Sequence, residues 1–405
     1  MLDPVPQLHP NTSCGKWGGA ACIEFPDRPG YQASMSSAVT HGVATERALC
    51  PMPSEHVRAL RLWLAGMALL VVAMILVGGA TRLTNSGLSI TEWRPIMGTI
   101  PPLNEADWQK AFAAYRKIPQ YTEINQGMSL GEFKTIFWWE WAHRFLGRVI
   151  GVAFFVPFAI FWAIGYIPRT FLPRLLGLFV LGGLQGALGW YMVKSGLVDR
   201  TDVSQYRLAA HFGVALSILG YTLWLLFGLG HEGRVGRTAG GSRASALVAG
   251  GILALVFLQL LAGALVAGLD AGMGYNTWPL INGAFVPSGL YEASPWYLNL
   301  FENPLTVQFD HRMIGYSVVV ASLAQLAWLA LRKAPTPLIG TAMILALVAL
   351  LQATLGVWTL LLAVPIQLGL AHQAGAVVVF AASVYHFWMA THTPEDVASQ
   401  ARASA

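Results

Sequence analysis

The chain has 405 residues, of which 55% are hydrophobic and only 11% carry charge, and its mean hydropathy is +0.54. A soluble protein of this length needs more charge to cover its surface, so the composition excludes a soluble enzyme. The net charge of +5 is modest, and we expect the lipid bilayer, not a nucleic acid, as the partner of this surface. Long apolar runs without alternation also exclude a transmembrane β-barrel. The sequence therefore predicts an all-α polytopic membrane protein.

Residues 1–57 are polar, rich in Pro, Gly and Ser, and lack periodicity, which predicts a disordered cytoplasmic tail. The three cysteines, Cys14, Cys22 and Cys50, lie in this tail on the reducing side of the membrane, so no structural disulfide is expected. Met35 is an alternative start, in which case residues 1–34 do not belong to the native protein.

Apolar windows of the length that spans a hydrocarbon core, about 20 residues, recur along the rest of the chain. They predict two halves, residues 58–230 and 245–390, joined by a cytoplasmic linker at 231–244 and followed by a cytoplasmic tail at 391–405. The eight predicted transmembrane helices cover residues 59–80, 143–166, 173–193, 207–229, 245–268, 308–331, 337–361 and 367–389.

The distribution of basic residues sets the orientation. The short loops after the second, fourth and sixth spans carry Arg and Lys, whereas the segment 269–307 contains neither. Because basic residues favour the inner side, both termini are expected on the cytoplasmic or matrix side. The even-numbered spans then run from the outer face to the inner face.

An internal repeat organises the two halves, since four landmarks recur in the same order. Each half holds four spans, so both halves share one orientation. This predicts two tandem four-helix bundles related by a pseudo-two-fold axis along the membrane normal. The paired positions are Gly79 with Gly263, Gly87 with Gly272, Trp93 with Trp278, Gly98 with Gly283, His143 with His311, Gln185 with Gln352, Gly189 with Gly356, and His211 with His372.

Four histidines, His143, His211, His311 and His372, fall within the first turn or two of spans that enter from outside. A single buried histidine is usually a hydrogen-bonded core residue. Two equivalent pairs at matched depth instead favour a cofactor held between facing helices. We expect the remaining histidines to play no part, namely His9, His41, His56, His231, His386 and His392.

The cofactor could be haem, with imidazole as axial ligand, or a bare metal ion. A bare ion needs a third or fourth ligand, for which only Glu140 and Asp310 are available. Haem is favoured by neighbouring glycines, which let a flat ring approach, and by guanidiniums suited to propionates. These residues are Gly182, Gly183, Gly186 and Gly189, and Arg82, Arg144, Arg148 and Arg312.

The two halves differ beside these ligands. Glu140 lies one turn before His143, whereas Gln308 takes that place before His311. A carboxylate in a low-dielectric site can act as a base or orient water, so we assign chemistry to the first half and a structural or electron-transfer haem to the second. A salt bridge from Glu140 to Arg144 is the alternative, and both can hold at once.

The two outside loops, 84–137 and 269–307, are rich in Pro, Gly and Trp and are expected to cap the two pockets. Residues 104–118 predict a short amphipathic helix with an Asn cap, lying at the membrane interface.

The motifs GGATRLTNSGLSITEW, EWAHRFLGR, LQGALGWYMVKSGL, AAHFG, DAGMGYNTWPL, FDHRMIGY, LQATLGVWTLL and LAHQAG resemble the haem A synthase family of bacterial and mitochondrial cytochrome oxidase assembly, over roughly residues 58 to 390. The resemblance implies oxidation of a ring methyl of haem O to the formyl group of haem A, by successive hydroxylations through a gem-diol. It further implies that His143 and His211 handle the substrate haem, that Glu140 is important for activity, and that His311 and His372 bind haem B.

The resemblance also implies a location and partners. The chain is expected in the bacterial or mitochondrial inner membrane, with haem O synthase and an electron-transfer partner beside it, and a homo-oligomer is a further expectation. Some family members have a cysteine pair in the first outside loop. Residues 84–137 contain no cysteine, which fits the cysteine-free subtype.

Two other functions are compatible with the histidines. A non-catalytic bis-histidine cytochrome b would use all four but leave the difference between Glu140 and Gln308 unexplained. A haem transporter would also suit an outward-facing pocket, but no span is interrupted at mid-membrane as in many transporters.

Overall fold

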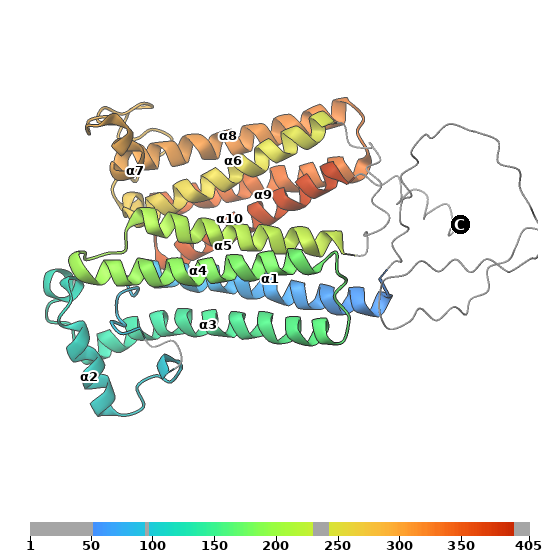
Figure 1. The fold of residues 1–405 in the computed structure, drawn as a ribbon. Coiled ribbons are helices and arrows are strands. Elements are labelled where there is room, and N and C mark those ends of the chain that lie inside the picture. Colours follow the sequence, from blue (N-terminus) through green and yellow to red (C-terminus); the bar gives the residue numbers. More distant parts are fainter. Residues whose placement is uncertain (1–51, 94–96, 230–242, 393–405) are drawn as a thin grey trace, which may run out of the picture.

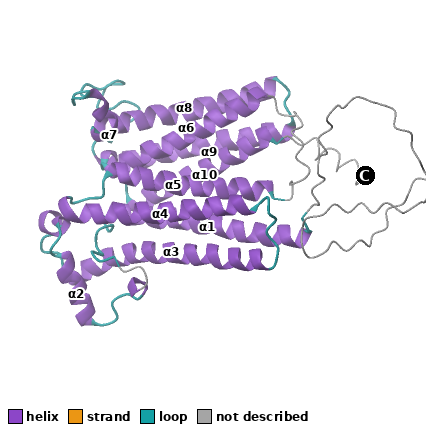
Figure 2. Cartoon of the chain, in the orientation of Figure 1, coloured by secondary structure: helices purple, strands orange, loops and turns teal. Residues whose placement is uncertain are grey.

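A computed structural model describes residues 52–93, 97–229 and 243–392. Eight of its helices are long and apolar enough to cross a membrane, and the described residues contain no strand (Figures 1 and 2). The prediction of an all-α polytopic membrane protein is thereby confirmed. The eight helices are α1 (Ser54–Leu83), α3 (Leu130–Ala163), α4 (Leu172–Asp199), α5 (Gln205–Gly228), α6 (Arg243–Gly268), α8 (Pro304–Leu331), α9 (Thr336–Leu361) and α10 (Ile366–Thr391).

The helices pack as two groups of four that lie side by side (Figure 1). In the first group α1 and α4 each contact α3 and α5, and in the second α6 and α9 each contact α8 and α10. Helices α3 and α5, and likewise α8 and α10, therefore occupy the diagonals of their groups. Helices α5, α6, α1 and α10 make the contacts between the groups. The pseudo-two-fold axis itself stays a prediction.

The main apolar core joins the two groups. It combines buried side chains of α1, α5, α6, α8, α9 and α10, among them Val71, Leu216, Val256 and Phe380. Many large apolar side chains on the other faces are exposed, such as Val152 and Leu351, as expected of surfaces that meet lipid. The helices are thus sorted into a protein-facing side and a lipid-facing side.

Short elements fill the outer loops. They are η1 (Met97–Thr99), α2 (Glu105–Tyr115) and η2 (Gln120–Ile124) in the first loop, and η3 (Ala271–Met273), η4 (Trp296–Leu298) and α7 (Asn299–Glu302) in the second.

Helix α2 confirms the short helix predicted at 104–118, with the Asn104 side chain accepting a hydrogen bond from the N–H of Asp107. Its apolar face, however, does not anchor it in lipid. Trp108, Phe112 and Tyr115 are buried against aromatic side chains at the start of α3. This burial raises the pKa of the Tyr115 phenol above its usual value of 10.0.

Helix α3 begins well before the predicted limit of 143. A capping box starts it, in which Ser129 and Glu132 exchange hydrogen bonds with each other's backbone N–H. Residues 130–137 then pack on α2 and η2. His143 therefore lies more than three turns inside α3, and its predicted place in the first turns of the helix was wrong. A hydropathy window does not detect this extension because capping and loop packing, not lipid, stabilise it.

Several predictions fall outside the described residues. These are the disorder of the N-terminal tail up to residue 51, the cysteines, the alternative start at Met35, the linker predicted at 231–244 as far as residue 242, and the tail predicted at 391–405 from residue 393. The helix α1 begins at Ser54, a few residues before the predicted boundary at 58.

Candidate functional site

Each group of helices brings one histidine pair together across its diagonal. The ring centres of His143 on α3 and His211 on α5 are 6.5 Å apart, and those of His311 on α8 and His372 on α10 are also 6.5 Å apart. A metal bonded to one nitrogen of each of two imidazoles, at about 2 Å per bond, places the ring centres roughly 6 Å apart. Each pair therefore has the spacing expected of two imidazoles that bind one metal centre from opposite sides.

A glycine on the neighbouring helix lies against each of the four imidazoles. A Cβ added to Gly78 would lie 3.2 Å from His143, to Gly189 3.0 Å from His211, to Gly263 3.1 Å from His311, and to Gly356 2.7 Å from His372. Because glycine has no Cβ, these four positions leave space for the imidazole rings. The arrangement corrects the repeat by one residue, since Gly78 rather than Gly79 is the counterpart of Gly263.

The other predicted glycines behave differently. A Cβ on Gly182, Gly183 or Gly186 would meet nothing within 4 Å, and all three residues are exposed. They leave an open surface on α4 beside the first histidine pair, which is compatible with a flat ligand.

Glutamine side chains contact three of the imidazoles. Gln185 lies 3.2 Å from Nε2 of His211, Gln352 lies 2.9 Å from Nδ1 of His372, and Gln259 lies 3.2 Å from Nδ1 and 3.3 Å from Nε2 of His311. A partner on one ring nitrogen orients an imidazole so that the other can bind a metal. Gln259 was missed in the sequence, although it precedes Gly263 by one turn and so shares its helix face.

Glu140 is buried, with 2% of its surface exposed, and both of its oxygens are engaged. Oε2 accepts from the Ser89 hydroxyl at 2.8 Å and from the Ile90 N–H at 2.7 Å. Oε1 accepts from Nη2 of Arg144 at 2.5 Å. The salt bridge to Arg144 that the spacing predicts is thus present, and Glu140 also ties the first outside loop to α3.

Arg144 completes this connection by donating to the backbone carbonyls of Ile90 at 2.8 Å and Glu92 at 3.2 Å. Arg144, which the sequence predicts as a partner of a haem propionate, is therefore hydrogen-bonded to the first outside loop. Arg148 lies one turn further along α3 and is half-buried.

The second half repeats this frame with different chemistry. Arg312 donates to the carbonyls of Tyr275 and Thr277 and to Oε1 of Gln308, at 2.8 to 2.9 Å. Gln308, also 2% exposed, donates through Nε2 to the carbonyl of Ala271 at 2.7 Å. The loop thus presents an acceptor to Gln308, whereas the first loop presents donors to Glu140.

Arg82 connects the two halves at the outer face. It donates to Oδ1 of Asn85 at 2.7 Å and to Oδ2 of Asp270 at 2.8 Å. Its guanidinium is 12% exposed and the Asp270 carboxylate 47%. The structure thus gives Arg82 a role in joining the loops that follow α1 and α6.

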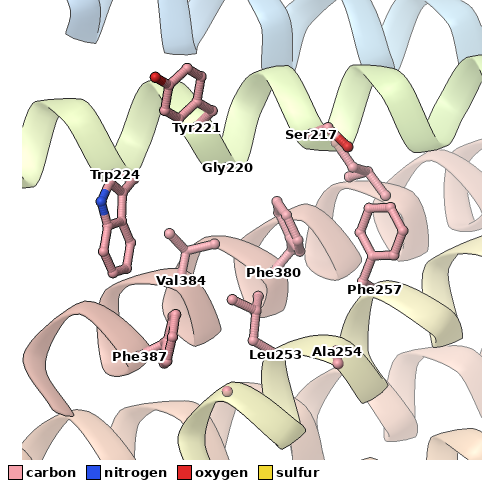
Figure 3. A pocket seen from close by; sticks show the side chains of 12 residues that line it. Ser217, Gly220, Tyr221, Trp224, Leu253, Ala254, Phe257, Phe380, Val384 and Phe387 are labelled. Carbon is pink, nitrogen blue, oxygen red and sulfur yellow. The ribbon is translucent and has the colours of Figure 1, made fainter. Parts of the chain in front are cut away.

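A bare metal ion finds no site of its own in the part of the chain that the structure describes, because no three His, Cys, Asp or Glu side chains gather there. The pairs instead suit a cofactor that brings its own equatorial ligands, as haem does. A separate apolar cavity of about 510 Å³ lies between α5, α6 and α10 (Figure 3), and its aromatic lining includes none of the four histidines.

Comparison with known proteins identifies the family of this chain. The model of the cytochrome oxidase assembly protein family matches residues 61–384. A haem A synthase of Parvibaculum lavamentivorans is 53% identical over 328 residues, 81% of this chain and 93% of the relative. Haem A synthases of Agrobacterium fabrum and Allorhizobium ampelinum are 49% and 48% identical, over 82% and 90% of this chain and 90% and 99% of theirs. The chain therefore belongs to the cytochrome oxidase assembly protein family.

Proposed function

We propose that this protein is a haem A synthase, a membrane oxidoreductase that converts haem O to haem A. The proposal rests on the family and on one observation, two histidine pairs of equal spacing that differ in the residue one turn before the first ligand. The reaction oxidises a ring methyl to a formyl group by successive hydroxylations, the last through a gem-diol that loses water.

In this proposal the first pair, His143 and His211, holds the substrate haem. The open glycine surface of α4 receives the flat ring, and Gln185 orients His211. Arg144 and Glu140 keep residues 89–92 over the pocket through the hydrogen bonds described above, which limits the access of water from the outer side.

Glu140 is the proposed acid–base group of the first pocket. Its Oε1 is committed to Arg144, so a proton would be taken up at Oε2. The Ser89 hydroxyl that donates to Oε2 can rotate away, whereas the Ile90 N–H is fixed by the backbone. The Ser89 hydroxyl would therefore release its hydrogen bond to Oε2 when Oε2 accepts a proton.

The second pair, His311 and His372, is proposed to hold haem B. The fit rests on the 6.5 Å separation, the glycines beside both rings, and the glutamines Gln259 and Gln352 on the ring nitrogens. Bound there, haem B would supply one-electron transfer. Arg148 in the first half and Arg312 in the second are the guanidiniums proposed to contact propionates, with Arg82 at the outer end of α1 and Arg144 on α3 contributing as well.

We further propose a bacterial or mitochondrial inner membrane with both termini inside, where haem O synthase supplies the substrate and a separate protein exchanges electrons. Self-association is proposed as well. The basic inner loops support the orientation, and the substrate's chemistry requires a reaction that makes haem O.

The test is to purify the protein from cells that also express haem O synthase, and to identify its extracted haems by chromatography and mass. Haem B together with haem A, or with a hydroxylated intermediate, is the expected result. Haem B alone, with haem O plentiful in the membrane, would favour the non-catalytic cytochrome b instead.

A further inference from the structure

Two polar residues repeat the spacing of the second histidine pair deeper in the membrane. Gln325 follows His311 by 14 residues on α8, and His386 follows His372 by 14 residues on α10. Fourteen residues are close to four helical turns, so each polar residue lies on nearly the same helix face as its histidine, about 21 Å further toward the inner side. Because α8 and α10 occupy a diagonal of their group, Gln325 and His386 both face its interior.

Both side chains are buried and carry polar atoms without a protein partner. Gln325 is 3% exposed and His386 is 0% exposed. The Nδ1 of His386 is 2.8 Å from the Thr341 hydroxyl of α9. Among the described residues, nothing bonds to Nε2 of His386 or to either amide atom of Gln325.

Three such atoms left dry would be costly, since each loses its hydrogen bonds to water. The surrounding hydroxyls, Ser322 and Ser383, donate to carbonyls of their own helices, so each keeps a free lone pair toward a further donor. Buried water typically makes about three hydrogen bonds to otherwise unsatisfied groups. Gln325 offers one acceptor, Oε1, and one donor, Nε2, and His386 offers its Nε2, so these three atoms match that requirement.

We propose that Gln325, Thr341 and His386 enclose a buried water site in the inner half of the second helix group. Intramembrane histidines mark functional interiors by default, and the proposal gives His386 a role that the sequence analysis does not assign to it. The first group has no counterpart, because the equivalent positions are Pro157 on α3 and Leu225 on α5.

An apolar layer separates the water site from the outer histidine pair. It consists of Val318 of α8, Leu345 and Ala349 of α9, and Val379 of α10. All four are buried and lie between the two sites along their helices. Neighbouring residues of α10, Val384 and Phe387, point instead into the apolar cavity between the groups (Figure 3). Buried apolar residues also lie on the inner side of the site, among them Leu329, Leu338 and Ala390. The site is therefore enclosed by apolar side chains on both sides, and it does not depend on the proposed function.

X-ray radiolytic footprinting of the full chain in lipid nanodiscs tests this site, since bound water generates hydroxyl radicals where it lies. We expect oxidation of His386 despite its complete burial, and no oxidation of Phe171, an intrinsically more reactive ring that is 1% exposed in an apolar cluster. An unmodified His386 under conditions that label partly exposed histidines such as His56 would overturn the proposal.

Substitution separates bound water from local opening of the helices. Gln325→Leu removes two water partners at similar volume, so His386 oxidation should fall several-fold, while Gln205→Leu, at a buried glutamine of the outer face, should leave it unchanged. Thermal unfolding supplies a second readout. A water-linked pair predicts that Gln325→Leu and His386→Leu are non-additive in Tm, whereas additive increases in Tm would show two independent, dry polar groups.

Discussion

The outer ends of the two halves share one frame and differ in the polarity of a single contact. In both, an arginine one turn after a buried Glu or Gln donates to two loop carbonyls, and a histidine lies between them in sequence. Glu140 accepts hydrogen bonds from a loop N–H and a hydroxyl, whereas Gln308 donates a hydrogen bond to a loop carbonyl. Each side chain thus has the hydrogen-bonding character that its own loop requires.

The comparison gives the exchange of Glu for Gln two physical meanings. The carboxylate satisfies donors that an amide would satisfy only in part, and it also places a titratable group one turn from His143, the proposed haem ligand. Sequence alone shows only the second meaning. Variants that exchange the carboxylate of Glu140 or the amide of Gln308 are therefore the sharpest way to compare the two halves.

The largest expected effect comes from the histidines. His311→Ala or His372→Ala should lose haem B completely, because one axial ligand and its packing both disappear, whereas His143→Ala should keep haem B and lose haem A production. The absorption spectrum and the extracted haems of each purified variant measure this. His392→Ala, at the inner end of α10, is the control, and a normal haem B spectrum in His372→Ala would refute the ligand assignment.

The glycines beside the ligands should give an intermediate effect. In Gly356→Ala the new Cβ would lie 2.7 Å from Cε1 of His372, closer than real contacts allow, so the ring must move and haem B content should fall. Gly340→Ala on the same helix meets nothing within 4 Å and should leave haem B unchanged. Equal haem B in the two variants would show that the glycine does not set the ring position.

The smallest effect is expected where the halves meet at the surface. Asp270→Asn removes the charge that Arg82 contacts. Because that carboxylate is 47% exposed, the free energy of unfolding should fall by only on the order of 0.5 kcal/mol. Thermal unfolding at low and high salt measures it. A difference from the unchanged protein that persists at high salt would mean that the pair is screened less than its exposure implies.

The sequence predicts much of this fold because lipid imposes long apolar windows, and it predicts the two histidine pairs because the repeat presents them twice. It fails where a role depends on a partner that only folding supplies. The start of α3 depends on packing against α2, and the loop contacts of Arg144 and Arg312 depend on where carbonyls lie.

The central claim, that the shared frame carries chemistry only in the first half, is tested most directly by Glu140→Gln. The protein is expressed with haem O synthase, and its haems are extracted and identified, with Gln308→Glu as the matched variant of the second half. The account predicts full haem B in Glu140→Gln, with haem O or a hydroxylated intermediate retained and haem A absent. Haem A at the level of the unchanged protein would contradict it and leave Glu140 as a loop contact alone.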